Sequence, residues 1–220
     1  QKTYDGNTSA TLNTGNYSLT GFVTVGGVTE GATVTQTSGT YNDRNVLLAN
    51  SVSTTLGTSF TSGLVWGDFT AQSGTNLGNY TLPTSATGAG SIGLRALTVS
   101  YTGDNRAYNG STVATVTTSL TAPNGYVSGD DLTVNRSASF DTKDLGTAKP
   151  ISVYGVSLSG TDASNYTVSS VGNTTGNVTR QDSVTWVGGA SGEWFNPANW
   201  AVTTHPSLTG AVPDLNNVKN

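Results

Sequence analysis

Side chains able to act as acids, bases or nucleophiles are few and scattered in this chain. Its 220 residues include one histidine, His205, and no cysteine. No serine lies in a Gly-x-Ser-x-Gly turn, the setting that exposes a nucleophilic hydroxyl above a sheet. Carboxylate pairs are conceivable among four aspartates, although aspartates also gather at turns for local hydrogen bonding. The four are Asp130, Asp131, Asp141 and Asp144. Since no convergent set of groups is present, we expect the chain not to be an enzyme.

Cation binding is the second chemistry that these residues could support. A hard cation such as Ca²⁺ takes oxygen ligands, and the pairs Asp104-Asn105 and Asp130-Asp131 would supply them from turns. No EF-hand spacing occurs, and glutamate is sparse. The sequence therefore predicts solvated turn carboxylates and no cofactor, with calcium as the open alternative.

Glycan binding is the third chemistry, because aromatic faces stack on the C–H surfaces of sugars while polar neighbours supply hydrogen bonds. The candidate glycan-binding residues are Trp66, Asp68, Trp194 and Trp200. The tryptophans near the end of the chain recur at spacings that also suit packing between turns. Trp66 differs from them, since it lies in Gly63–Phe69, and an exposed version of that segment would form a binding patch.

The charge and the apolar runs of the chain exclude two further classes of function, nucleic-acid binding and membrane spanning. Charged residues make up only 10% of the chain, and the net charge is -4. Basic runs that would track a phosphate backbone are absent, so we expect no nucleic-acid binding. No apolar run approaches the roughly 20 residues of a membrane span. Gln1 opens the chain without a signal-peptide pattern, so we expect an internal fragment of a larger protein.

The elements that position these residues read as short strands. Thr, Ser, Asn and Gly dominate the polar composition, which favours pleated surfaces and tight turns. Ile151–Leu158 and Leu97–Tyr101 alternate apolar and polar residues, the pattern of a half-buried strand, and turn residues follow each such run. No stretch shows a helical period. We therefore predict an all-β chain.

A repeat divides the chain into two similar copies and a tail. Three motifs recur in the same order: residues 2–11 resemble 106–115, residues 39–46 resemble 138–145, and residues 77–82 resemble 163–168. We expect a first repeat over 1–94, a second over 95–180 and a Trp-rich, incomplete β segment over 181–220. The first copy carries an insertion at about 47–70. Residues 96–103 read as the first strand of the second copy, so the first copy lacks a matching strand.

The repeated motifs themselves read as turn chemistry. Asp and Asn side chains bond back to backbone N–H groups, Gly accepts positive φ, and a Tyr ring packs inward. A closing Asn-Tyr motif in each copy would tie a strand to a loop. The predicted structural turn residues are Tyr4, Asp5, Gly6, Asn79 and Tyr80 in the first copy and Tyr108, Asn109, Gly110, Asn165 and Tyr166 in the second.

These motifs resemble the YDG-type repeat of large bacterial exoproteins of the filamentous-haemagglutinin type. The resemblance covers most of residues 1–180. The tail, from Trp186 to Trp200, is similar to a Trp-Gly-Gly…Trp…Asn-Trp motif of autotransporter-like passengers, where it introduces a β-solenoid. The resemblance implies tandem Ig-like β-sandwich repeats followed by a partial strand-and-turn, β-solenoid-like segment. It also implies two-partner secretion, a secreted or bacterial cell-surface location, and a role in adhesion and virulence.

Two functions from different classes follow from this resemblance. In the first, the chain is a semi-rigid stalk or spacer in cell adhesion. Its partners are then neighbouring repeats of the same chain, while the parent protein contacts host-cell or matrix glycans or proteins. In the second, the chain is a lectin-like module that itself binds those glycans. An enzyme acting on surface polysaccharide would need two carboxylates about 5–10 Å apart, and it ranks behind both.

Overall fold

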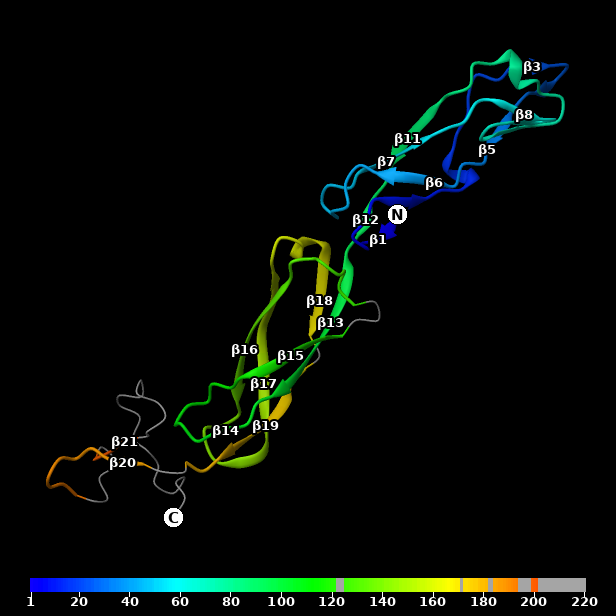
Figure 1. The fold of residues 1–220 in the computed structure, drawn as a ribbon. Coiled ribbons are helices and arrows are strands. Elements are labelled where there is room, and N and C mark those ends of the chain that lie inside the picture. The colour runs from blue at the N-terminus through cyan, green and yellow to red at the C-terminus, as the bar shows by residue number, and fades with distance from the viewer. Residues whose placement is uncertain (122–124, 171, 182–183, 194–198, 202–220) are drawn as a thin grey trace. The chain divides into compact units, whose positions relative to one another are not determined.

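The computed structural model describes residues 1–121, 125–170, 172–181, 184–193 and 199–201 (Figure 1). Over these residues the chain is nearly all β, with short 3-10 turns between strands, so the all-β prediction is confirmed. Contacts divide the chain into two compact units. Unit 1 comprises Gln1–Arg95 with Ser164–Thr167, and unit 2 comprises Ala96–Ala163 with Val168–Asn220. Tandem Ig-like sandwiches remain a prediction.

Unit 1 is built from short strands. They are β1 (Lys2–Thr3), β2 (Ser9–Thr11), β3 (Thr24–Val25), β4 (Val28–Thr29), β5 (Ala32–Val34), β6 (Ser38–Tyr41), β7 (Ser51–Thr55), β8 (Phe60–Ser62), β9 (Val65–Trp66), β10 (Phe69–Ala71), β11 (Ser85–Ala89) and β12 (Ile92–Gly93). Two 3-10 turns interrupt them, η1 (Thr14–Asn16) and η2 (Leu77–Asn79). Each turn follows an Asn, Asn13 or Asn76, whose side chain accepts a hydrogen bond from a backbone N–H two residues on. Such local bonds end the strands and start the turns.

The strands of unit 1 form two four-stranded sheets, in the orders β11-β7-β6-β2 and β5-β10-β9-β8, and two strand pairs, β1-β12 and β3-β4. A buried cluster holds the second sheet against the loops and turns around it. Its members are Val34, Leu56, Phe69, Ala71 and Leu77. Phe22, Trp66 and Leu82 pack on this cluster from the outside.

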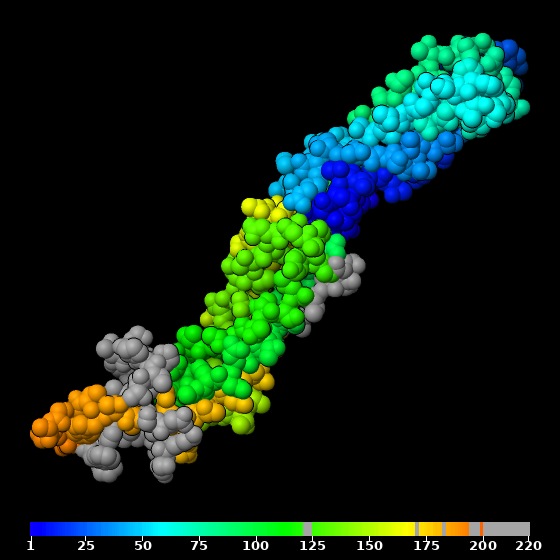
Figure 2. Space-filling view, viewed as in Figure 1, coloured from blue at the N-terminus to red at the C-terminus, as the bar shows by residue number. Residues whose placement is uncertain are grey.

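The insertion expected at about 47–70 forms most of the second sheet. Within this range β7 belongs to the first sheet, whereas β8, β9 and the start of β10 at Phe69 belong to the second. β10 pairs antiparallel with β5, with Phe69 opposite Val34, and β9 pairs with both β8 and β10. The residues around 60–70, cyan in the space-filling view, lie together on the surface at one end of unit 1 (Figure 2). The additional length is therefore an ordered sheet that carries Trp66.

Unit 2 has longer strands than unit 1. Its elements are β13 (Arg95–Gly103), β14 (Arg106–Ala107), β15 (Val116–Thr121), β16 (Thr133–Phe140), β17 (Gly146–Ser159), η3 (Ala163–Asn165), β18 (Tyr166–Ser170) and β19 (Thr174–Thr179). Three of them, β13, η3 and β18, include residues that the contacts assign to unit 1. They form a three-stranded sheet, β15-β13-β18, and a four-stranded sheet, β14-β19-β17-β16.

The core of unit 2 lies on the inner faces of these two sheets. One buried cluster contains Tyr108, Ala114, Val116, Ala138, Phe140, Ile151 and Val178. Leu97 and Val99 of β13 are also buried, with exposures of 1% and 0%. These two residues alternate with Thr98 and Ser100, which are half-buried. The alternation predicted for Leu97–Tyr101 therefore arises because one face of this strand lies in the core.

Two of the strand pairings in unit 1 have counterparts in the four-stranded sheet of unit 2. Tyr41 of β6 pairs with Val52 of β7, as Phe140 of β16 pairs with Ile151 of β17. β1 pairs parallel with β12, as β14 pairs parallel with β19. The three-stranded sheet has no such counterpart among the strands of residues 1–95.

Beyond β19, the described residues contain two short strands, β20 (Thr185–Trp186) and β21 (Trp200–Ala201), which pair antiparallel. The rest of the tail lies outside the described residues, so the β-solenoid expectation stays a prediction. Across the described ranges, the structure contains no helix with the length and apolar character needed to span a membrane.

Candidate functional site

The Tyr-Asp-Gly turn of unit 1 is held together by Lys2. Its ammonium group donates hydrogen bonds to Asp5 Oδ1 at 2.6 Å, to the Asn7 carbonyl at 2.7 Å and to Asn7 Oδ1 at 2.9 Å. The Asn7 N–H also donates to Asp5 Oδ1. Gly6 has φ of 79°, the left-handed conformation that Gly adopts without strain. Tyr4 is fully buried beneath this turn.

The pKa of Asp5 reflects these contacts. Partial burial raises this pKa, but the hydrogen bond from Lys2 and the backbone hydrogen bond from Asn7 lower it, and the net pKa lies below its usual value. The carboxylate is therefore stabilised in its charged form. This is what a structural turn requires, whereas a general acid needs a raised pKa.

The Tyr-Asn-Gly turn of unit 2 uses the same arrangement with different residues. The Arg106 guanidinium donates to Asn109 Oδ1 and to the Ser111 carbonyl, in the place of the Lys2 ammonium. Gly110 has φ of 75°, and Tyr108 is buried with 1% exposure. Arg106 also lies over the Phe140 ring, 5.0 Å from its centroid, as Lys2 lies 5.6 Å from that of Tyr41. A cation two residues before the Tyr is thus a shared part of the motif.

A second shared contact holds the main chain of each turn Tyr. Arg95 Nη1 donates to the Tyr4 carbonyl at 3.1 Å, and Gln181 Nε2 donates to the Tyr108 carbonyl. Sequence comparison did not find this pair, because Arg95 and Gln181 differ in type and lie more than 70 residues from their partners. The turn in each unit is consequently tied to the residue that directly follows its predicted repeat.

The closing Asn-Tyr motif of unit 1 anchors a distant loop. Tyr80 Oη donates to Glu30 Oε2 and accepts a hydrogen bond from the Val23 N–H. The Tyr80 ring also packs edge-on against Phe22, with centroids 4.9 Å apart. The hydrogen bond to Glu30 raises the pKa of the Tyr80 hydroxyl, since the phenol must lose the proton that it donates. Asn79, by contrast, is exposed.

The equivalent motif, Asn165-Tyr166, lies in the Ser164–Thr167 segment of unit 1. Asn165 is fully buried, its Nδ2 donates to Asn45 Oδ1 at 2.9 Å, and its Oδ1 accepts from the Val46 N–H at 2.9 Å. The Tyr166 ring packs edge-on against Tyr4. The two closing Asn residues therefore occupy different surroundings, although their sequence motifs are alike.

Trp66 is half-buried and forms part of the wall of unit 1. It packs on the cluster that contains Phe69, and it contacts Gly78 closely enough that a Cβ there would lie 3.3 Å from Trp66 Cη2. Its neighbour across β8–β9, Phe60, is 60% exposed, and the two rings meet edge to face with centroids 5.3 Å apart. Leu64 in the same hairpin is 48% exposed. The more exposed aromatic face of this hairpin therefore belongs to Phe60, which sequence reasoning did not single out.

Asp68, the polar neighbour proposed for a glycan site, is engaged by the main chain. Its Oδ2 accepts from the Gly57 N–H at 2.6 Å, and its own N–H donates to the Gly57 carbonyl at 2.9 Å. The close approach needs glycine at position 67, because a Cβ at Gly67, which has φ of 58°, would lie 2.2 Å from the Gly57 oxygen. One carboxylate oxygen of Asp68 thus stabilises the turn before β10.

The structure describes the other two tryptophans proposed for glycan binding, Trp194 and Trp200, less completely. Trp194 lies outside the described residues, and for Trp200 only the strand β21 is described. Trp186 pairs with Trp200 across β20–β21 and donates from Nε1 to the Gly189 carbonyl at 2.8 Å. His205 also lies outside the described residues.

Two of the four aspartates considered for acidic pairs, Asp131 and Asp141, are engaged by other groups. Asp131 Oδ2 accepts from the Thr161 N–H, and Asp162 Oδ2 accepts from the Asp131 N–H, so these two carboxylates fasten the β17–η3 loop. Asp141 lies 2.8 Å from Lys149 Nζ, whose hydrogen bond lowers the pKa of Asp141. In the described part of the chain, no group of three or more Asp, Glu, His or Cys residues could hold a metal ion.

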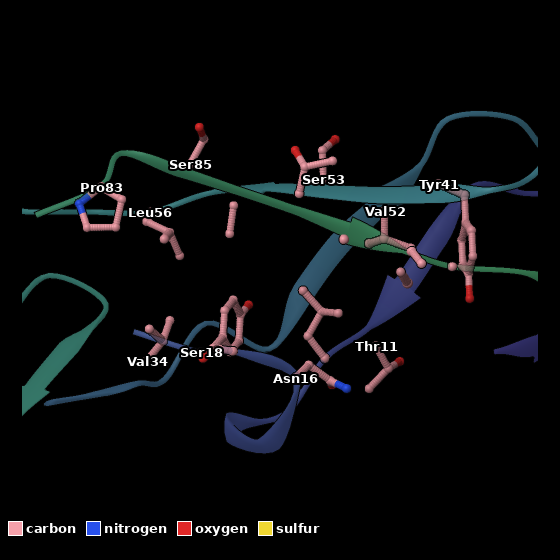
Figure 3. A pocket seen from close by; sticks show the side chains of 18 of the residues that line it. Thr11, Asn16, Ser18, Val34, Tyr41, Val52, Ser53, Leu56, Pro83 and Ser85 are labelled. Atoms are coloured by element: carbon pink, nitrogen blue, oxygen red, sulfur yellow. The ribbon is translucent and has the colours of Figure 1, made fainter. Parts of the chain in front are cut away.

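A groove of about 560 Å³ opens on unit 1 and was not expected from the sequence (Figure 3). Val34 and Leu56 lie at one end, and Val52 and Tyr41 lie at the other. Half-buried side chains of the loop around η1 line one side, and the segment from Pro83 to Gly90 lines the other. Its lining is both apolar and polar, and it lies within residues 1–90.

Comparison with known families gives one match. Residues 94–175 match the YDG domain. The match spans β13 to β18 and reaches the start of β19, with Tyr108, Asn109 and Gly110 inside it, and it covers less than half of the 220 residues. No curated protein and no solved structure matches the chain. The YDG match thus supports the recognition of the second copy, and it concerns the domain alone.

Proposed function

We propose that this chain is an extracellular repeat module of a bacterial adhesin and acts as a semi-rigid stalk or spacer. The observation that carries the proposal is the same strand pairing in both units. Near the start of each repeat a short strand pairs parallel with a strand near its end, with Lys2 opposite Ile92 in unit 1 and Arg106 opposite Val178 in unit 2.

Parallel pairing between a strand near the start of a repeat and a strand near its end suits a module that bears tension. When such a unit is pulled from its ends, the two strands slide past each other, and their hydrogen bonds are loaded together rather than one after another. In unit 1 these bonds include Lys2 N–H to the Ser91 carbonyl and Tyr4 N–H to the Gly93 carbonyl. The bond from Arg95 to the Tyr4 carbonyl lies beside them and would add to the resistance.

The remaining parts of the proposal rest on composition and resemblance. Low charge and the absence of Cys are compatible with a secreted or cell-surface exoprotein. The YDG match supports a YDG-type domain alone, and the link to haemagglutinin-like, two-partner-secreted adhesins rests on the resemblance of the repeat motifs. Under this proposal the parent protein contacts host-cell or matrix glycans or proteins, and this chain contacts its neighbouring repeats. We further propose that it catalyses no reaction.

Single-molecule pulling of the full chain tests the mechanical role. One experiment pulls the chain from its two ends, and a second pulls it between the C-terminus and a Leu47→Cys attachment, which bypasses β1. Leu47 is 78% exposed, so the attachment disturbs no core contact. We expect unit 1 to unfold at a higher force in the first geometry. Equal unfolding forces in the two geometries would contradict the stalk proposal.

A lectin-like module is the second candidate, and the exposed ring of Phe60 beside Trp66 is the observation that favours it. A glycan array should compare the chain with its Trp66→Ala and Phe60→Ala variants, and with Leu47→Ala as a control far from both rings in the sequence. We expect weak or no binding. Binding that is lost in either aromatic variant and kept in Leu47→Ala would instead establish the lectin function.

A further inference from the structure

The Asn109-Gly110 pair in the turn of unit 2 brings together two groups that can react with each other. When a main-chain nitrogen attacks the Cγ of the preceding Asn, a five-membered imide ring closes. Gly hinders this attack least, because it carries no side chain. The sequence contains two such pairs, Asn109-Gly110 and Asn124-Gly125, and Asn124 lies outside the described residues.

The hydrogen bonds around Asn109 are distributed as this reaction requires. Its Oδ1 accepts from the Arg106 guanidinium and, at 3.1 Å, from the Ser111 N–H. The bond from Ser111 folds the Asn109 side chain back over the turn, and both donors lie where negative charge develops as Cγ is attacked. Among the described residues, the Gly110 N–H and the Asn109 Nδ2 group have no hydrogen-bond partner. The attacking nitrogen and the leaving group are therefore both unrestrained.

The turn of unit 1 demonstrates that the same contacts accommodate an aspartate. Asp5 occupies the position of Asn109 in the repeated motif. Its Oδ1 accepts from the Lys2 ammonium at 2.6 Å and from the Asn7 N–H at 3.2 Å, a cation and a main-chain donor as in unit 2. An aspartate formed at position 109 would thus find its partners already in place.

We propose that the turn of unit 2 converts its own Asn109 to aspartate. The Gly110 nitrogen bonds to Asn109 Cγ and loses its proton to solvent, and Nδ2 leaves as ammonia. One water molecule from the solvent then breaks the bond between Cγ and the Gly110 nitrogen, which opens the ring and leaves a carboxylate on Cγ. Side-chain amide and water thus become carboxylate and ammonium, without an oxidant or a reductant. Arg106 stabilises the charge on Oδ1 during the attack and pairs with the carboxylate afterwards.

The contacts of the turn also select the product. Water can open the ring at Cγ, which gives aspartate, or at the main-chain carbonyl, which gives isoaspartate and lengthens the main chain by one carbon. Because Arg106 polarises the bond between Cγ and Oδ1, it directs the water to Cγ. The conversion happens once in each chain and consumes the chain's own side chain, so it does not rest on the stalk role and involves no external substrate.

Peptide mass spectrometry of the full chain, sampled over time at neutral pH, measures the conversion of Asn109. A synthetic peptide of residues 104–114 in the same buffer is the matched control, since it has the same neighbours in sequence and lacks the fold. We expect conversion about tenfold or more faster in the folded chain, because only the fold holds both donors on Oδ1. An equal or slower rate in the folded chain would overturn the proposal.

Substitutions of Arg106 separate its chemical role from a merely structural one. Arg106→Met removes the donor and should slow the conversion of Asn109 about tenfold, while Asn124 in the same chain converts at an unchanged rate. Arg106→Lys restores a cation and should keep most of the rate. Gln181→Leu loosens the turn by removing the bond to the Tyr108 carbonyl, yet leaves the donors of Oδ1, and should have little effect. Equal losses in Arg106→Met and Gln181→Leu would contradict the role of Arg106, and the comparison with the peptide holds even if a variant does not fold.

Labelling with an isoaspartyl methyltransferase identifies the product, because this enzyme modifies isoaspartate and not aspartate. We expect little labelling after conversion of the folded chain and strong labelling after conversion of the peptide. Equal labelling of the two would mean that the turn does not direct the opening of the ring, and the proposed formation of an aspartate paired with Arg106 would then be wrong.

Discussion

The Lys2 ammonium lies 2.6 Å from the Asp5 carboxylate, and this ion pair closes the first Tyr-Asp-Gly turn. The pair sits at the surface, with the Asp5 side chain 42% exposed. In unit 2 an Arg106–Asn109 hydrogen bond takes its place without an acidic partner. The charge on Asp5 is therefore an addition to a turn that forms without it.

Acid should remove the contribution of this ion pair. Because the pKa of Asp5 is lowered in the folded chain, its contribution is present above the ordinary value of 3.8 and is lost as the pH falls through the folded pKa. Asp5→Asn should cost about 0.2–1 kcal/mol at neutral pH and less at about pH 2. Urea unfolding of both proteins at the two pH values measures this. An equal cost at both would mean that the carboxylate charge is not what matters.

Gly110→Val should destabilise unit 2 by about 1–3 kcal/mol, because a β-branched residue is strained at a φ of 75°. Gly88→Val is a suitable control, since Gly88 has no positive φ and its Cβ would meet nothing within 4 Å. Thermal unfolding of the two variants compares them. An unchanged melting temperature in Gly110→Val would refute the turn role of this glycine.

Glu30→Gln should return the pKa of Tyr80 towards its usual value, because the hydrogen bond to Glu30 is the main cause of the raised pKa. A raised folded pKa stabilises the chain below the ordinary tyrosine pKa, and this stability is lost as the pH rises through the folded value. Ultraviolet titration of the native chain minus that of Tyr80→Phe isolates this hydroxyl among nine tyrosines. A difference curve that does not move in Glu30→Gln would contradict the assignment.

Trp66→Ala should destabilise unit 1 by about 2 kcal/mol, since a half-buried ring leaves the cluster around Phe69. Phe60→Ala should cost less than about 1 kcal/mol, because that ring is 60% exposed. Chemical denaturation followed by circular dichroism compares the two variants. A larger cost for Phe60→Ala would reverse the roles assigned to these rings.

The local parts of this fold could be predicted from sequence. Tyr4 and Tyr108 were expected to pack inward above a Gly of positive φ, and the structure places them so. These features depend on neighbouring residues, because side-chain oxygens bond to backbone groups two or three residues away. The contacts of Arg95 and Gln181 with the turn carbonyls could not be predicted, because each joins residues more than 70 positions apart.

By itself, the sequence determined that the chain is β, where it turns and that its pattern repeats, since all three follow from alternation and turn chemistry along the chain. Tertiary structure decided what each copy exposes. It placed Phe60 in solvent and Trp66 against the core, and it left the groove between Val34 and Tyr41 open. The burial of a side chain depends on which strand lies beside it.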